Sequence, residues 1–229
     1  MLITLEGIEG SGKTTQLGHM VDYFKTKGKD CVVTREPGDT EIGRKIRAIL
    51  LDPENKNLDP MAELFLYAAD RAQHIEERIK PSILSGKIVI SDRFHDATTV
   101  YQGCARGLHP DIINRIHRIV LKDLKPDVTL LFDLPPEIGL KRAWQQVNAG
   151  TRTNTETRFE KEALSFHEKV RQGYLDLARH EPERFYVIDA SLPEEKVTAA
   201  IINILNGMTW VRHKSGGARI EIKKKITDD

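Results

Sequence analysis

The sequence predicts an α/β fold in which a parallel five-stranded sheet is covered by helices on both faces. Short apolar, β-branched runs alternate with longer helical patterns, as in repeated βαβ units. The runs are continuously apolar, which is typical of parallel strands buried on both faces. A length of 229 residues suits one compact domain with a substantial core. The expected strands are residues 2–5, 31–34, 88–91, 128–132 and 185–188.

The first strand runs into a glycine-rich segment with the pattern GxxxxGK[ST], and an amphipathic stretch follows. In this strand-loop-helix context backbone N–H groups turn toward phosphate oxygens, Lys13 reaches the β and γ phosphates, and Thr14 ligates Mg²⁺. An ordinary glycine-rich turn is the alternative, which the Lys-Thr pair disfavours. We therefore expect a P-loop NTPase-like fold that binds a nucleoside triphosphate. The expected contacts are Gly7, Ile8, Glu9, Gly10, Ser11, Gly12, Lys13, Thr14 and Thr15.

Polar residues follow the other four runs, at residues 35–38, at Asp92 and Arg93, at Asp133, and at residues 189–191. The carboxyl ends of parallel strands meet at one edge of a sheet, so these residues predict a nucleotide cleft. Asp92 can hold Mg²⁺ through water while Arg93 clamps a phosphate, although a surface Asp-Arg pair would look the same. Asp133 is the competing magnesium carboxylate. We favour Asp92 because its arginine neighbour makes a better acceptor site.

Composition limits the partners of the chain. With 35 basic and 34 acidic residues the net charge is +1, so nothing indicates nucleic acid or membrane as a partner. No stretch reaches the ~18 apolar residues of a membrane span, and no targeting leader precedes the first strand. Cys31 and Cys104 have no metal-ligand spacing and fit a reducing compartment. We expect a cytoplasmic protein.

Further motifs follow the glycine-rich loop in a fixed order. They are Thr34-Arg-Glu-Pro-Gly38, Leu66-Tyr-Ala-Ala-Asp-Arg-Ala-Gln-His74, Asp92-Arg93 with Tyr101-Gln-Gly103, and Thr157-Arg-Phe-Glu160 leading to Phe166-His-Glu-Lys-Val170. This ordered set resembles the thymidylate kinase family, of the bacterial-like type with a lid arginine. The order and spacing of the motifs distinguish this family from the adenylate, guanylate and cytidylate kinases. The resemblance covers a domain of residues 1–206. It implies transfer of the γ-phosphoryl group of Mg-ATP to dTMP, in dTTP biosynthesis, by a homodimer.

The resemblance also implies residue roles in substrate binding. Tyr67 and Arg71 lie four apart in a helical pattern, hence on one face, where a ring can stack on a pyrimidine while a guanidinium donates to its carbonyl. The alternative for Tyr67 is that it is an aromatic residue of the core, and the alternative for Arg47 is that it lies on a solvent-exposed face of its helix. The implied substrate contacts are Glu36, Arg47, Tyr67, Arg71, Arg93, Thr98 and Gln102.

A polar stretch at residues 145–158 is expected to form a lid over the triphosphate, with a plain surface loop as the alternative. The glycine-rich loop has Gly10 and Ser11 where some relatives place a basic residue, so an arginine must come from elsewhere. Arg158 is the first candidate and Arg152 the next, while Arg142 is expected to pack against adenine. The expected catalytic residues are Lys13, Arg93, Arg158 and Glu9.

The chain departs from the family pattern at Asp39, Ala97 and Thr157, where relatives commonly have a glycine, a hydroxyl residue and an aspartate. Residues 207–229 form an extension beyond the family domain, with a pattern of two short strands around a Ser-Gly-Gly turn and a basic tail. We assign this extension no activity, because three lysines beside two aspartates are typical of a solvated segment.

Two other functions remain open from the sequence. One is a kinase of a different acceptor, such as dUMP or a nucleoside. The other is a non-catalytic nucleotide switch or nucleic-acid-binding module, which only the glycine-rich loop and the basic tail favour.

Overall fold

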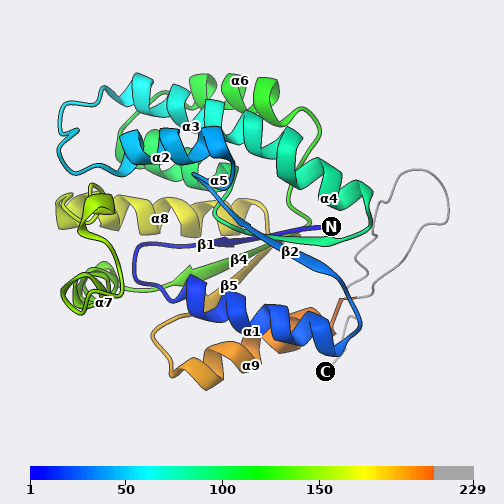
Figure 1. Cartoon of the computed structure of the whole chain (residues 1–229). Helices are drawn as coiled ribbons and strands as arrows, with labels where there is room; N and C mark the ends of the chain where they lie inside the picture. The colour runs from blue at the N-terminus through cyan, green and yellow to red at the C-terminus, as the bar shows by residue number, and fades with distance from the viewer. Residues whose placement is uncertain (209–229) are drawn as a thin grey trace.

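The computed structural model describes residues 1–208, so the expected hairpin and basic tail lie outside the described residues. The described chain alternates strands and helices in the order expected (Figure 1). The elements are β1 Leu2–Glu6, α1 Lys13–Thr26, β2 Cys31–Arg35, α2 Glu41–Leu51, α3 Pro60–His74, η1 Ile75–Ile79, α4 Lys80–Leu84, β3 Ile88–Asp92, α5 His95–Thr98, η2 Thr99–Ala105, α6 Pro110–Leu121, β4 Val128–Asp133, α7 Pro136–Asn148, η3 Asn154–Glu156, α8 Leu164–His180, β5 Phe185–Asp189 and α9 Glu194–Asn206.

The five strands form one parallel sheet in the order β2-β3-β1-β4-β5, which confirms the predicted fold class. Each strand continues one residue beyond its predicted end, because ladder pairing persists through the first polar residue after the apolar run. Leu5 pairs with Asp92, for example, and Asp133 pairs with Asp189. The polar residues that carry chemistry are therefore the last residues of the strands and are held by the sheet itself.

Helices cover both faces of the sheet, as predicted (Figure 1). Helices α1 and α9 lie on one face, while α4 and α8 pack on the other beneath α2, α3 and α6. The largest core cluster joins β1, β3 and β4 to α1, α8 and α9, and a smaller cluster surrounds Leu2, Val89 and Phe94. The carboxyl ends of the strands and the start of α1 share one edge, which is where the cleft opens. No helix within residues 1–208 has the length and hydropathy needed to cross a membrane.

Candidate active site

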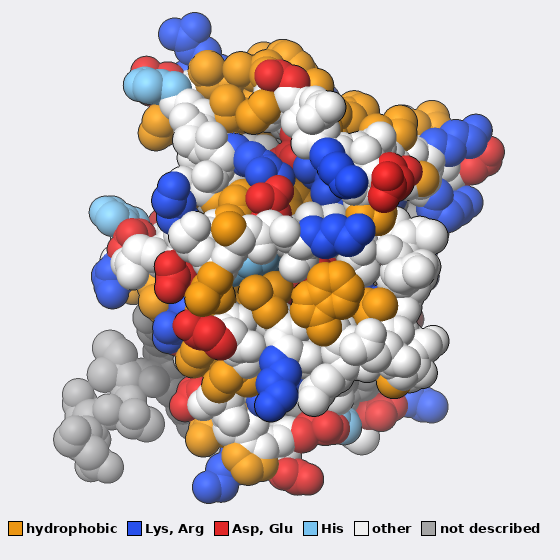
Figure 2. All heavy atoms as spheres, turned by 90° about the vertical axis from the view of Figure 1, so that its left-hand side faces the viewer, with side chains coloured by type: hydrophobic (Ala, Val, Ile, Leu, Met, Phe, Trp, Pro, Cys, Tyr) orange, Lys and Arg blue, Asp and Glu red, His pale blue; other side chains and the backbone are white. Residues whose placement is uncertain are grey.

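The phosphate loop, residues 7–15, connects β1 to α1 and forms one wall of a cavity of about 540 Å³. We call this cavity the cleft. Gly10 has a φ of 69°, and a Cβ there would lie 2.1 Å from the carbonyl oxygen of Gly139, so the loop needs glycine at this position. Figure 2 faces the strand-end edge and shows Lys and Arg side chains gathered around its centre. The other lining residues come from the ends of β2 and β3, from α2, α3, α5 and η2, and from the lid.

Lys13 is buried and curls back over the phosphate loop. Its Nζ donates to the carbonyl oxygens of Gly7 at 3.1 Å and Ile8 at 2.9 Å, and to Ser11 Oγ at 3.2 Å. Burial lowers the pKa of the Lys13 ammonium to about 8, and the nearby Arg93 adds to this effect. At this pKa the ammonium is still mostly charged at neutral pH, and an anionic group beside it would stabilise the charged form further.

Arg93 follows β3 in the left-handed region, with a φ of 68°. Its guanidinium donates to Glu9 Oε1 at 2.9 Å and to the Tyr174 hydroxyl at 3.2 Å, and lies over the Tyr101 ring at 4.9 Å. Burial alone would raise the pKa of the Glu9 carboxyl, but Arg93 and His167 outweigh burial and hold that pKa well below its usual range. Glu9 is therefore ionised, and it aims the Arg93 side chain along the cleft.

The two candidate magnesium carboxylates differ in their surroundings. Asp92 lines the cleft beside Thr14, and its Oδ1 is buried with no hydrogen-bond partner among the described residues. Asp133 is instead bound by Arg171, whose Nε and Nη2 lie 2.7 and 2.9 Å from its two oxygens, and it does not line the cleft. A carboxylate and a hydroxyl are suitable Mg²⁺ ligands when phosphates and water complete the coordination. The geometry favours Asp92.

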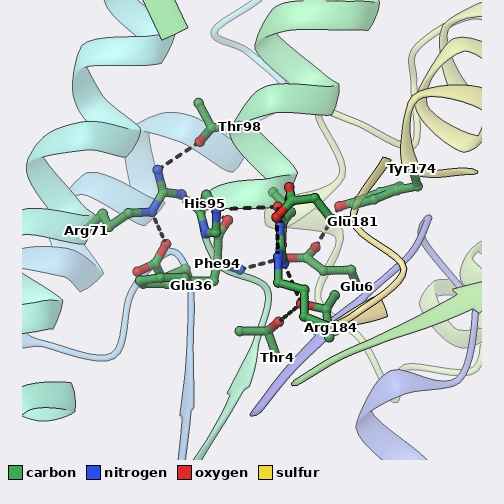
Figure 3. Close-up of polar contacts among 12 residues, drawn as sticks. Thr4, Glu6, Glu36, Arg71, Phe94, His95, Thr98, Tyr174, Glu181 and Arg184 are labelled. Atoms are coloured by element: carbon green, nitrogen blue, oxygen red, sulfur yellow. Dashed lines mark hydrogen bonds and ion pairs between the residues drawn. The ribbon is translucent and has the colours of Figure 1, made fainter. Parts of the chain in front are cut away.

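Arg71 lines the cleft on α3, and Figure 3 shows its side chain between Glu36 and Thr98. It is 1% exposed and donates to Glu36 Oε2 at 2.7 Å, Thr98 Oγ1 at 3.0 Å and the Phe94 carbonyl oxygen at 3.1 Å. Burial would raise the pKa of the Glu36 carboxyl, but Arg71 and His74 lower it below its ordinary value. Glu36 thus serves as the buried counter-charge that fixes Arg71.

Tyr67 and Gln102 line the cleft on the same side as Arg71. Gln102 donates from Nε2 to Glu63 Oε1 at 2.7 Å, which fixes the orientation of its amide. Arg47, the last expected substrate contact, also lines the cleft, but Glu156 of η3 binds its guanidinium through both oxygens at 2.7 and 2.9 Å. The structure therefore brings all seven expected substrate residues to one cavity.

The arginines in and near the lid are placed differently from the expectation, because Arg152 lines the cleft and Arg158 does not. Arg152 lines the cleft and pairs with Glu160, whereas Arg158 is buried outside the lining residues, with its guanidinium on the Leu50 carbonyl oxygen and Glu63. Helix α7 also extends to Asn148, into the range expected for the lid. Arg142 donates to the Ala190 carbonyl oxygen at 3.0 Å and does not line the cleft.

Two of the three departures from the family pattern are accommodated outside the cleft. Asp39 pairs with Arg78 Nε at 2.8 Å and is absent from the lining residues, so its charge does not face the phosphates. Thr157 donates to the Asn154 carbonyl oxygen at 2.9 Å. Ala97 alone lines the cleft, next to Thr98.

Sequence reasoning missed two buried groups that organise the site, Glu63 and His167. Glu63 accepts from Gln102 and Arg158, and His167 lies between Glu9 and Phe159. A signal for Glu63 was present, because Glu63, Tyr67 and Arg71 are spaced by four residues and share one face of α3. His167 lies within the Phe166-His-Glu-Lys-Val170 motif, but that motif assigned no contact to its ring.

Comparison with known proteins gives a consistent result. The family model described as thymidylate kinase matches residues 5–201. The chain is 57% identical to the thymidylate kinase of Desulfosudis oleivorans over 205 residues, covering 90% of this chain and 96% of that protein. It is also 57% identical to the thymidylate kinase of Desulforapulum autotrophicum over 206 residues, covering 90% and 91%.

Solved structures agree with the sequence comparisons. The crystal structure of thymidylate kinase from Ehrlichia chaffeensis superposes with a TM-score of 0.70 at 33% sequence identity, covering 90% of this chain and 98% of that chain. The matched range includes the phosphate loop, the Arg71 wall and the lid. The chain therefore belongs to the thymidylate kinase family of nucleoside monophosphate kinases.

Proposed function

We propose that the chain phosphorylates dTMP to dTDP with Mg-ATP as the donor, with the γ-phosphoryl group passing between the phosphate loop and Arg93. One observation carries this proposal: the phosphate loop and the Arg71 wall line a single cleft, with Arg93 also in its lining. A volume of about 540 Å³ lies in the range of small-molecule sites. A switch protein that binds only a triphosphate would have no use for the second wall.

The acceptor is a phosphate oxygen that is already anionic, so catalysis needs alignment and charge neutralisation rather than a strong base. Lys13 and the start of α1 bind the donor phosphates, and Arg93 binds the acceptor phosphate and the transferring group. Mg²⁺, held by Thr14 and by Asp92 through water, would neutralise charge on the β and γ phosphates. Glu9 contributes by holding Arg93 in place.

Base recognition rests on Arg71 and its neighbours. Three of the five N–H donors of a guanidinium are used by the protein, which leaves two for a pyrimidine carbonyl. Tyr67 offers a ring for stacking, and Thr98 and Gln102 offer polar groups beside it. This supports a pyrimidine acceptor.

Arg152 replaces Arg158 as our first candidate for the lid arginine. It lines the cleft, and its partners are the Glu156 carbonyl oxygen within the lid and Glu160, two residues beyond the end of the lid. Arg158 instead stabilises the wall that carries Glu63. Arg142 remains a candidate for packing against adenine beyond the described cleft lining.

We further propose that the chain forms a homodimer in the cytoplasm. Large apolar side chains are exposed on three adjacent helices, with Ile42 and Ile49 on α2, Phe65 on α3 and Ile119 on α6. Figure 2 shows hydrophobic side chains along the top of the molecule, where Figure 1 places these helices. Such a patch is typical of a protein interface. Sedimentation at micromolar concentration should give twice the monomer mass, and Phe65→Glu should shift it toward monomer.

The reaction is tested by ADP release with Mg-ATP and each of dTMP, dUMP, dCMP, dGMP and AMP. A clear preference for dTMP supports both the reaction and the base wall. Preference for another acceptor would keep the phosphate chemistry but contradict the assignment of the Arg71 wall. Absence of release with every acceptor would contradict the proposed kinase activity.

A further inference from the structure

His167, in the first turns of α8, is fully buried and has no role in the chemistry described above. Its Nε2 lies 3.0 Å from the carbonyl oxygen of Phe159, and its Nδ1 lies 3.3 Å from Oε2 of Glu9. Neither Nδ1 nor Glu9 Oε2 has a hydrogen-bond partner within residues 1–208. Two buried polar atoms therefore face each other at ion-pair distance, between the phosphate loop and the segment that follows the lid.

The partners of the ring determine its protonation state. A carbonyl oxygen only accepts, so the Nε2 of His167 carries a proton. In a neutral ring Nδ1 would then present a lone pair to the carboxylate of Glu9, which is repulsive. In the imidazolium both nitrogens donate and the two charges attract, so the contacts fit the charged ring.

The charges around the ring lead to the same protonation state. The titratable groups that face it are Glu9 from the phosphate loop and Glu160 from the lid side, and Glu160 is itself paired with Arg152. Burial would lower the pKa of the His167 imidazole, but Glu9, the Phe159 carbonyl and Glu160 together raise it above its ordinary value. Glu9 is ionised, as shown above, so the pair is a salt bridge.

Glu9 transmits this contact to the reacting region. Its Oε1 accepts from Arg93 at 2.9 Å and from the Tyr101 hydroxyl at 2.7 Å, while Oε2 faces His167. A carboxylate whose two oxygens are held from opposite sides cannot rotate freely. Arg93 in turn depends on Glu9 and on Tyr174 for its direction.

We propose that His167 is a positioning residue: as an imidazolium it fastens the Glu9 carboxylate, and through it Arg93, to the main chain at Phe159, where the lid joins the wall of the cleft. Alignment of Arg93 then depends on the charge of His167. The inference rests on the proposed function in one respect, namely that Arg93 acts on the phosphates during transfer. It extends that function by linking the phosphate loop to the end of the lid through one buried side chain.

Two substitutions separate the two bonds of the ring. His167→Asn places an amide nitrogen near the position of Nδ1, which keeps a donor to Glu9 that does not titrate and loses the bond to Phe159. His167→Gln extends its amide to the position of Nε2, which keeps the bond to Phe159 and loses the donor to Glu9. The two variants have similar volume and polarity, so each is the control for the other.

The kinetic measurement is kcat against pH with saturating Mg-ATP and dTMP, because bound triphosphate keeps Lys13 protonated. We expect wild-type kcat to fall as His167 loses its proton, His167→Asn to lose less kcat than His167→Gln and to lack this alkaline decline, and His167→Gln to lose roughly tenfold or more at every pH. KM for ATP should change little in both. Equal kcat values in the two variants, or an unchanged alkaline decline in His167→Asn, would overturn the inference.

A second measurement does not depend on turnover. Imidazole resonances of the eight histidines can be followed against pH by NMR, and the resonance missing from His167→Asn identifies His167. We expect it to titrate above 6.5 in wild type and lower in Glu9→Gln. A pKa below 6.5 in wild type would overturn the inference even in an active kinase. A wild-type protein that fails to phosphorylate dTMP would instead refute the proposed function and leave this titration intact.

Discussion

The phosphate end and the base end of the cleft are built in different ways. At the phosphate end one continuous segment, residues 7–15, supplies the glycines, Lys13 and the start of α1, and Lys13 bonds only to that segment. At the base end Arg71 depends on Glu36, which follows β2, and on Phe94 and Thr98, which follow β3, so its partners come from two other parts of the chain. The first end is a local motif, and the second is a product of tertiary packing.

This difference separates function from stability at the two ends. Lys13 belongs to a turn whose backbone is set by glycines, so its charge can be removed with little effect on the core. Arg71 is the permanent counter-charge of a fully buried Glu36, so its removal leaves that carboxylate in the interior with only the His74 ring as a partner. Substitutions at the phosphate end should therefore alter rates, whereas those at the base end should alter rates and stability together.

The largest kinetic effect is expected for Lys13→Ala. We expect kcat to fall by roughly 10²–10³-fold or more, because the lost ammonium stabilises the charge that develops on the transferring phosphoryl group. The thermal unfolding midpoint should change by only a few degrees, since the hydrogen bonds of Lys13 within the described residues all go to its own loop. Steady-state kinetics and thermal unfolding measure the two effects, and near-normal turnover would contradict the role of Lys13.

The two lid arginines differ in the same way, one affecting mainly the rate and the other mainly the stability. Arg152→Ala should mainly lower kcat, by about 10²-fold, because Arg152 lines the cleft and is half-buried; it also removes the charged partner of the buried Glu160, so some loss of stability is expected as well. Arg158→Ala should mainly destabilise the protein, by about 3 kcal/mol, because it removes the nearest charged partner of the fully buried Glu63 and leaves only Arg106, at 3.4 Å. Single-turnover rates and urea unfolding compare the two variants. The reverse pattern would restore Arg158 as the lid arginine.

The same contrast explains how much the sequence could predict. All five strands, the parallel sheet and the phosphate loop follow from contiguous patterns, so they were predicted to within a residue. The residues of the base wall were expected through the family resemblance, but the contacts that orient them were not, because Glu36 and Arg71 are 35 positions apart and nothing local joins them. Arg158 and Arg152 are both arginines of a polar stretch, and only packing distinguishes the one that faces the cleft.

At the base end, Arg71→Ala and Thr98→Val form a graded pair. Arg71→Ala should reduce the free energy of unfolding by about 3 kcal/mol and raise KM for dTMP, because it removes both a base contact and the arginine partner of Glu36, leaving only His74 on that carboxylate. Thr98→Val keeps the shape and removes one hydrogen-bond acceptor of Arg71, at a cost of about 1 kcal/mol.

For both variants, urea unfolding measures the change in stability, and steady-state kinetics with dTMP and dCMP measure the change in base preference. Thr98→Val should weaken the preference for dTMP while the protein remains folded, which tests base reading apart from stability. Unchanged kinetics with both nucleotides in the folded Thr98→Val protein would show that this part of the wall does not read the base.

The smallest effect is expected at Asp39, which directly follows the Pro-Gly turn and does not line the cleft. Its carboxylate pairs with Arg78, which is 46% exposed, so the pair contributes less than about 1 kcal/mol. Asp39→Gly should leave kcat and KM for dTMP within about twofold, because the charge lies outside the cleft and is already neutralised. Asp39→Asn is the control that keeps the side chain and removes only the charge. A gain in dTMP affinity in both variants would mean that Asp39 does repel the acceptor phosphate. In that case its pairing with Arg78 would not isolate its charge from the cleft, and the contrast between a local phosphate motif and a packed base wall would not hold at this residue.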